Sequence, residues 1–174
     1  MPFNQQMTVP CQLTLRNTPD GPRLFAEPID ELRSLRETSK ALTETQITPP
    51  TPLRSEIRGE LLDVELELQG TPTSTASLTV RGIPVVFDFR KNELSCRNVV
   101  APLEPVGERI RLRVLVDRGS IEIFGNDGRV AISVGATPRS DDQTVELSTK
   151  GGDLIVYSLN VAQLRSAWAG QAGQ

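Results

Sequence analysis

The sequence predicts an all-β protein: a two-sheet antiparallel β-sandwich of the jelly-roll or concanavalin-like kind, preceded by a β-hairpin and one short α-helix. Apolar and polar residues alternate with a period of two in segment after segment, as in strands with one buried face. Glycine, proline and asparagine separate these segments at short intervals. The sequence shows no long amphipathic helices, so a parallel α/β sheet is disfavoured.

The N-terminal part of the chain follows a different plan from the rest. Residues 12–16 and 23–27 are expected to form a hairpin around the turn signal at residues 18–21. Pro28 is expected to open a short helix, with acids in its first turn and arginines later. Residues 39–52 are polar and carry three prolines near their end, which predicts an extended connector.

The strands of the sandwich are predicted from apolar residues that alternate with polar ones. In residues 64–68 the apolar positions alternate with acids, and in residues 110–116 they alternate with arginines. Phe87 and Phe89 share a face with Val85 and are expected in the core. Further strands are expected at residues 78–80, 121–123, 130–134, 145–147 and 154–161.

Length and charge limit the classes of partner. The 174 residues are enough for one domain with a sizeable core and a smaller N-terminal part. Because 19 Lys and Arg stand against 22 Asp and Glu, neither nucleic acid nor a membrane surface is an expected partner. No apolar run approaches the ~20 residues that span a bilayer. The first ten residues do not resemble a signal peptide, so the chain would be cytoplasmic if expressed as it stands.

The chain offers few groups for catalysis or metal binding. It contains no histidine, so an enzyme here would rely on carboxylates, tyrosine or lysine. Cys11 and Cys96 are far apart, which predicts two unpaired thiols rather than a disulfide or a zinc site. Asp63, Glu65 and Glu67 alternate along one strand and are expected to form a solvated face. We therefore expect no metal and no cofactor.

The candidate binding residues lie mainly between Asp117 and Gly128, where acids and an arginine gather around two turns. Asp117, Arg118 and Glu122 could exchange paired hydrogen bonds with the vicinal hydroxyls of a sugar. Tyr157 is the aromatic side chain that could contact a ligand. A structural interpretation stays open, in which Asp117 caps backbone amides of its turn and Arg118 pairs with a neighbouring acid.

Several motifs resemble the C-terminal part of glycoside hydrolase family 32, the β-fructosidases that include levanases, invertases and inulinases. The motifs are residues 3–10, Leu13-Thr14-Leu15-Arg16, the Pro28 helix with Glu31-Leu32, residues 112–118, Ile121-Glu122-Ile123-Phe124, and residues 164–168. The resemblance covers essentially the whole chain. It implies a C-terminal β-sandwich module, similar to carbohydrate-binding module family 66, which holds the terminal fructose of levan.

In that family a five-bladed β-propeller carries catalysis by a retaining pair of carboxylates. Its motifs Asn-Asp-Pro-Asn, Arg-Asp-Pro and Glu-Cys do not occur in this sequence. The resemblance thus implies a remnant of the last propeller blade at residues 1–27, a helix and Pro-rich connector at 28–54, and the sandwich at 55–170.

The resemblance implies a non-catalytic accessory module of a β-fructosidase, with no catalytic residue of its own. Its expected partners are a β-propeller catalytic domain, or a second copy bound through the N-terminal hairpin, and a fructan or other fructose-terminated saccharide. The alternative is a stand-alone, lectin-like domain that binds carbohydrate or protein.

Overall fold

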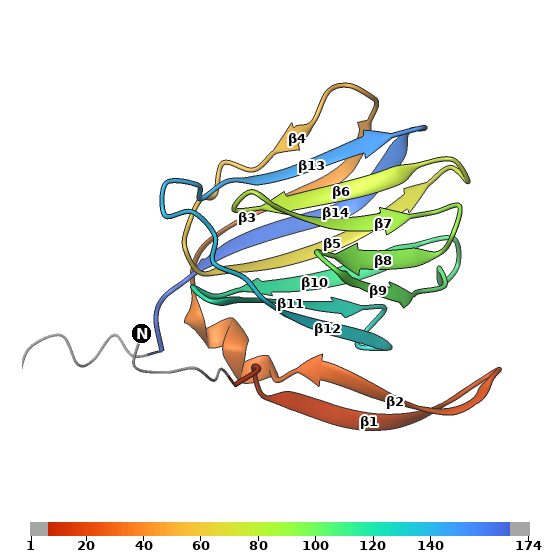
Figure 1. Cartoon of the computed structure of the whole chain (residues 1–174), viewed down its shortest axis with the longest axis horizontal. Helices are drawn as coiled ribbons and strands as arrows, with labels where there is room; N and C mark the ends of the chain where they lie inside the picture. Colours follow the sequence, from red (N-terminus) through yellow and green to blue (C-terminus); the bar gives the residue numbers. More distant parts are fainter. Residues whose placement is uncertain (1–6, 168–174) are drawn as a thin grey trace, which may run out of the picture.

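The structure, a computed structural model, describes residues 7–167 and consists of a two-stranded hairpin and two six-stranded antiparallel sheets (Figure 1). The hairpin pairs β1 (Cys11–Thr18) with β2 (Gly21–Pro28). Sheet 1 has the order β12 (Val130–Gly135), β11 (Ser120–Gly125), β10 (Ile110–Val116), β5 (Leu62–Gly70), β14 (Leu154–Leu164) and β3 (Arg36–Ile47). Sheet 2 has the order β4 (Leu53–Arg54), β13 (Val145–Lys150), β6 (Thr75–Val80), β7 (Ile83–Asp88), β8 (Glu93–Cys96) and β9 (Val99–Pro102).

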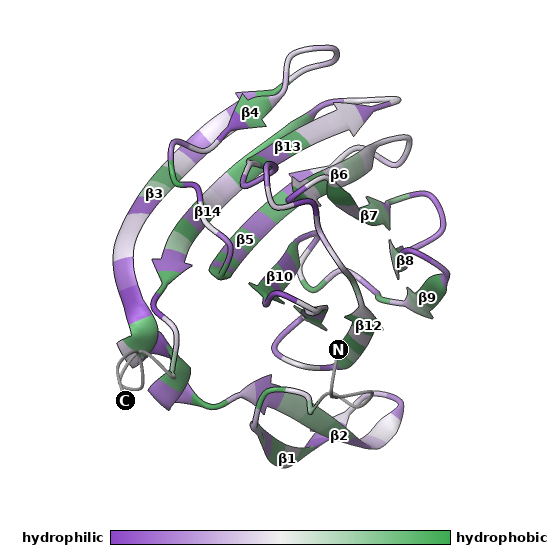
Figure 2. Cartoon of the chain, turned by 60° about the vertical axis from the view of Figure 1, so that its left-hand side comes forward, coloured by the Kyte–Doolittle hydropathy of each residue, from purple (hydrophilic) through white to green (hydrophobic). Residues whose placement is uncertain are grey.

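The two sheets enclose one apolar core, which confirms the predicted sandwich. Val64, Leu66 and Leu68 of β5 are at most 3% exposed, as the alternation predicts. Phe87 is buried and meets the edge of Phe89 at a centroid distance of 4.8 Å. Figure 2 shows hydrophobic and hydrophilic residues alternating along the strands of sheet 1. Two-residue periodicity therefore identifies the inward face of β5 and of the other strands that were predicted from it.

The prediction of a connector at residues 39–52 is wrong for residues 39–47, because these belong to β3, an edge strand of sheet 1. It pairs with β14 from Ile47 opposite Leu154 to Arg36 opposite Leu164. An edge strand can stay polar because its neighbour supplies the backbone partners, while one edge and one face meet water. Leu42 and Ile47 contact the core. The short strands β4, β8 and β9 also escaped prediction.

The expected α-helix is a 3-10 helix, Asp30–Leu35. Pro28 ends β2 instead of opening the helix. Six residues are too few to offset the cost of nucleating an α-helix, and short pieces commonly adopt 3-10 geometry. Arg36 is already extended, so the chain passes directly into β3.

The hairpin packs on the outer face of sheet 1, with β2 drawn between β1 and the sandwich in Figure 1. Ala26 N–H donates to the carbonyl of Gly128 at 2.9 Å, and Arg129 pairs with Asp20 at 3.1 Å. Phe25 is only 8% exposed. The tight turn predicted around Gly128 is confirmed, since that residue has a φ of 77°.

Candidate functional site

Asp117 and Arg118 form the exposed turn between β10 and β11. Asp117 Oδ1 accepts a hydrogen bond from the Arg118 backbone N–H at 2.7 Å. Arg118 Nε lies 3.3 Å from Glu60 Oε2, with the two side chains 63% and 42% exposed. The turn therefore contains the backbone cap and the ion pair of the structural interpretation, while its side chains stay open to solvent.

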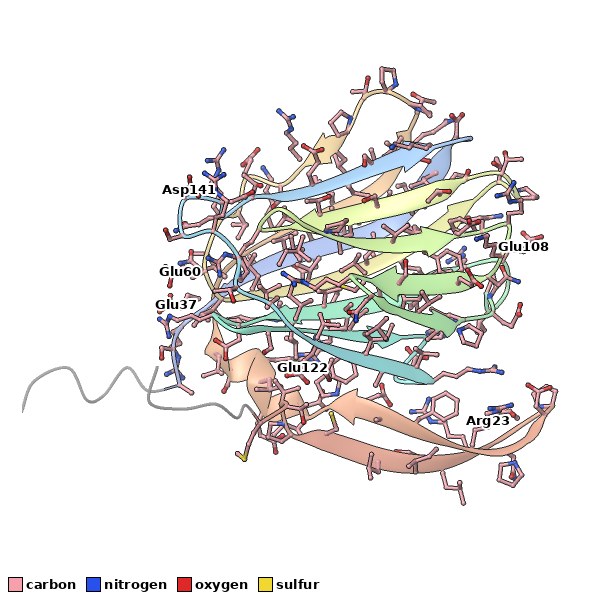
Figure 3. The ribbon with its side chains drawn as sticks, viewed as in Figure 1. Arg23, Glu37, Glu60, Glu108, Glu122 and Asp141 are labelled. Carbon is pink, nitrogen blue, oxygen red and sulfur yellow. The ribbon has the colours of Figure 1, made fainter. Side chains whose placement is uncertain are left out.

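Glu122 lies on the outer face of sheet 1, on the side of the hairpin (Figure 3), and is 3% exposed. Its Oε1 accepts a hydrogen bond from Val9 N–H at 2.9 Å. It lines a pocket of about 140 Å³ with Ser120, Ser133 and the N-terminal segment at Met7. Burial raises the pKa of the Glu122 carboxyl, against the hydrogen bonds from Val9 and Ser133. Glu122 thus serves mainly to hold the N-terminal segment.

We expect Glu122→Gln to gain stability relative to the wild type as the pH rises. Because the folded-state pKa of Glu122 is raised above its ordinary value of 4.5, the stability from its neutral form is complete below that value. This stability is lost as the pH rises through the folded-state pKa, whereas glutamine stays neutral and can still accept from Val9. Urea unfolding of both proteins across acid to neutral pH measures the difference.

Glu37→Gln is the control, because it removes the same charge from an exposed site on β3. A stability of Glu122→Gln relative to wild type that stays constant or falls as the pH rises would contradict a raised pKa of the Glu122 carboxyl.

Tyr157 lies at the opposite end of the sandwich from Arg118. Its hydroxyl donates to Gln69 Oε1 at 2.7 Å, and the Arg109 guanidinium lies 3.5 Å from the centre of its ring. Gln69 in turn donates to Glu108 Oε2 at 3.1 Å. Figure 3 labels Glu108 and Glu60, the partner of Arg118, at opposite ends of the molecule. The four predicted residues therefore do not converge on one ligand.

A charge cluster that the sequence did not reveal lies on the outer face of sheet 1. Asp63, expected in solvent, is fully buried and accepts from Arg36 at 2.6 Å and from Arg113 at 3.0 Å. Glu65 pairs with Arg36 at 3.0 Å and with Arg33. Burial opposes ionisation of Glu65, but the charges and hydrogen bonds of Arg36 and Arg33 outweigh it and lower its pKa.

The prediction of a solvated acidic face is therefore wrong at Asp63. Arg36 belongs to β3 and Arg33 to the 3-10 helix, and both reach over the acids from 27 or more residues away in sequence. A strand pattern does not show which distant element covers its outer face. The available signal was that arginines occur both in the predicted short helix and in the predicted strand at residues 110–116, where they could pair with these acids.

A polar cleft of about 300 Å³ lies between the hairpin, the 3-10 helix and the outer face of sheet 1. Three of its acids pair with arginines: Glu67 with Arg109, Asp127 with Arg111 and Glu65 with Arg113. Its charged lining residues are Glu27, Asp30, Arg33, Glu65, Glu67, Arg111, Arg113 and Asp127. Within residues 7–167, no three His, Cys, Asp or Glu side chains are arranged to hold a metal ion. Over the same range, no helix is long and apolar enough to cross a membrane.

The fold and these surfaces define an antiparallel β-sandwich module with a hairpin packed on its outer face. The sequence model described as glycosyl hydrolases family 32 C terminal matches residues 31–163. The chain belongs to this family.

Levanases are among the curated relatives. The chain is 32% identical over 191 residues to the levanase of Bacillus sp. (strain L7), covering 94% of this chain and 20% of that protein. It is 27% identical to the levanase of Bacillus subtilis (strain 168), covering 96% of this chain and 28% of that protein. The chain thus spans less than a third of the length of either relative.

Solved structures support the fold. The exo-inulinase from Aspergillus awamori matches with a TM-score of 0.75 and 19% identity, over 92% of this chain and 36% of that chain. Beta-fructofuranosidase from Schwanniomyces occidentalis matches with a TM-score of 0.72 and 17% identity, over 91% of this chain and 40% of that chain.

Proposed function

We propose that this chain is a non-catalytic accessory module that docks on the catalytic β-propeller of a β-fructosidase. One observation carries the proposal: an apolar surface on the hairpin faces away from the sandwich. We call this surface, made of Leu13, Leu15 and Leu24, the leucine face. These side chains are 62%, 70% and 58% exposed.

The register of the hairpin accounts for the leucine face. Leu15 lies directly opposite Leu24, so both point to the same side of the two-stranded sheet. The adjacent pair, Thr14 and Phe25, points to the other side, where Phe25 is buried. Alternation therefore gives the hairpin an outward face that carries the three leucines and an inward, mainly polar face on which Phe25 is buried.

The pairing of β1 supports the same partner. Among the described strands, β1 pairs with β2 alone, which leaves its other edge open to a further strand. An open edge beside an apolar face is what a propeller blade would cover by continuing its sheet. The similarity to longer levanases and to an exo-inulinase favours a β-fructosidase propeller as the partner.

The absence of the three carboxylate motifs from the sequence supports a module that is non-catalytic on its own. Hydrolysis of β-fructosides would then reside in the propeller, and the module would stabilise it. The binding partner to test is a propeller domain encoded next to the gene for this chain.

Recognition of a terminal fructose at the Asp117 turn is the second candidate function. The observation that favours it is the exposed pair of Arg118 and Glu60, whose charged groups can both reach a hydroxyl from solvent. Titration of the wild type and of Arg118→Ala with fructo-oligosaccharides distinguishes binding at this turn from binding elsewhere on the sandwich.

The double variant Leu15→Ser/Leu24→Ser is expected to weaken binding to the propeller domain at least about tenfold, because each central apolar anchor of an interface contributes 1 kcal/mol or more. The full chain and the separately expressed propeller are mixed, and the complex is measured by size-exclusion chromatography with light scattering and by calorimetry. Fructose release from sucrose, inulin and levan is assayed for each component and for the complex.

Val100→Ser is the matched control, because Val100 is 59% exposed and lies on β9 of sheet 2 rather than on the hairpin. It should leave propeller binding unchanged. Fructose release by this chain alone would refute the non-catalytic role. Equal binding by the double variant and wild type would refute docking through the leucine face.

A further inference from the structure

A cavity of about 700 Å³ opens at the end of the sandwich that carries Glu108, the end away from the Asp117 turn (Figure 3). Loops from both sheets build it: the turn after β5, the end of β3, the residues after β7 and the loop before β10. We call it the end cavity. Of the four predicted binding residues, Tyr157 is connected to it, through the hydrogen bond to Gln69.

Part of the lining of the end cavity is apolar. Phe89 is half-buried there, and Ile155 is 44% exposed. The Phe89 ring is fixed by its edge contact with Phe87 and by the bare backbone of Gly70, where a Cβ atom would lie 2.6 Å from the ring. Pro72 and Pro105 complete the apolar surface. A fixed aromatic ring beside aliphatic groups suits the C–H face of a sugar ring.

The lining of the end cavity also contains amides and carboxylates that hold one another in place. Gln46 and Gln69 lie opposite Ile155 on the two strands that flank β14. Gln46 donates to Asp153 at 2.9 Å. Gln69 donates to Glu108 at 3.1 Å and is itself held by Tyr157. Such pairs present fixed acceptors and donors to a ligand without first having to be ordered.

We propose that the end cavity binds a neutral saccharide, with its ring against Phe89 and Ile155 and its hydroxyls on the Gln46–Asp153 and Gln69–Glu108 pairs. The described lining contains two carboxylates and no lysine or arginine, which disfavours an anionic ligand. Amides and carboxylates together satisfy hydroxyls, which both donate and accept hydrogen bonds. The amphipathic lining is that of a small-molecule site.

Fructo-oligosaccharides prepared from levan and from inulin are the probes, and their choice rests on the proposed function. Malto-oligosaccharides provide a second neutral saccharide without fructose. Titration of the ¹⁵N-labelled full chain with each probe should shift the backbone amide signals of Gly70, Asn92 and Ile155.

Two variants, one in each hydrogen-bonded pair, are Gln69→Ala and Asp153→Ala. Each is expected to weaken binding by roughly fivefold to tenfold, the effect of losing one or two hydrogen bonds. Thermal unfolding checks that each variant is folded. Arg54→Ala, an exposed substitution on β4, should bind as the wild type does. Arg118→Ala tests the turn at Asp117 in the same assay.

Shifts confined to residues 117–120 and abolished by Arg118→Ala would overturn the end cavity as the binding site. Titrations without shifts for any of these saccharides would overturn it as well. If malto-oligosaccharides alone shifted the amide signals of the end cavity, the proposed saccharide site would be supported and fructan would be rejected as its ligand. Each result is independent of docking, because propeller binding is measured with the leucine-face variants.

Discussion

Replacing Asp63 with asparagine is expected to lower the free energy of unfolding by about 3 to 5 kcal/mol, the usual cost of breaking a buried ion pair. The carboxylate is fully buried, while the Arg36 and Arg113 side chains are 17% and 11% exposed. Asparagine keeps the size of the side chain but leaves two guanidinium groups without the acid they share. It should therefore loosen both β3 and the charge cluster against β5.

Glu67→Gln is the matched control on the same strand. Glu67 pairs with Arg109 at 3.3 Å, but both side chains are at least 30% exposed. Exposed pairs contribute about 0 to 1 kcal/mol, so this variant should stay close to the wild type. Urea unfolding, followed by far-UV circular dichroism, measures both. A loss below about 1 kcal/mol for Asp63→Asn would show that the buried pairs are replaceable.

Gly128→Ala is expected to detach the hairpin from the sandwich. The added Cβ would lie 2.1 Å from the Ala26 carbonyl oxygen, and the φ of 77° already disfavours a side chain. Because a backbone atom cannot move aside as a flexible side chain does, β2 must shift away from the turn. We expect faster tryptic cleavage after Arg16 and Arg23 than in the wild type.

Gly107→Ala is the control that separates the strain of a left-handed backbone from the steric contact with Ala26. Gly107 also has a positive φ, 58°, but its added Cβ would meet nothing within 4 Å. It should lose only the roughly 1 to 2 kcal/mol of a left-handed backbone and leave hairpin cleavage unchanged. If both variants behaved alike in proteolysis, the close approach of Ala26 to Gly128 would not be what positions the hairpin.

These two predictions bear on function, because the hairpin carries the leucine face. Detaching it at Gly128 should weaken propeller binding even though all three leucines remain. Asp63→Asn should also loosen the N-terminal elements, because its partner Arg36 is the first residue of β3 and directly follows the 3-10 helix that connects β3 to the hairpin. The proposed docking would therefore depend on how rigidly sheet 1 holds the hairpin and the 3-10 helix.

The sequence predicted the parts of the fold that depend on local patterns. Period-two alternation predicted β5 and β10. The sequence Asn126-Asp127-Gly128 predicted the turn before β12, and all three residues have a positive φ. It missed β3, because Leu42 and Ile47 are the residues of this edge strand that contact the core, and most of its other positions are polar, so the strand lacks regular alternation. It also gave the wrong helix type, since six residues after a hairpin carry too little periodicity to distinguish 3-10 from α.

The candidate site was predictable only residue by residue. The sequence marked Asp117 and Arg118 as a turn, and these residues do form one. It grouped them with Glu122 and Tyr157, yet Glu122 is buried under the N-terminal segment and Tyr157 supports Gln69 at the other end. Neighbours across sheets depend on register, which residue types alone do not specify.

By itself the sequence determined the class of fold, the inward face of the alternating strands and the family resemblance, because alternation, turn chemistry and short motifs are local features of the chain. The tertiary structure decided what covers each outer face. It brought Arg36 and Arg113 onto Asp63, turned Leu15 outward, and assembled the end cavity from distant loops. These outcomes follow from long-range strand pairing and packing, whose energies depend on partners that no local segment contains.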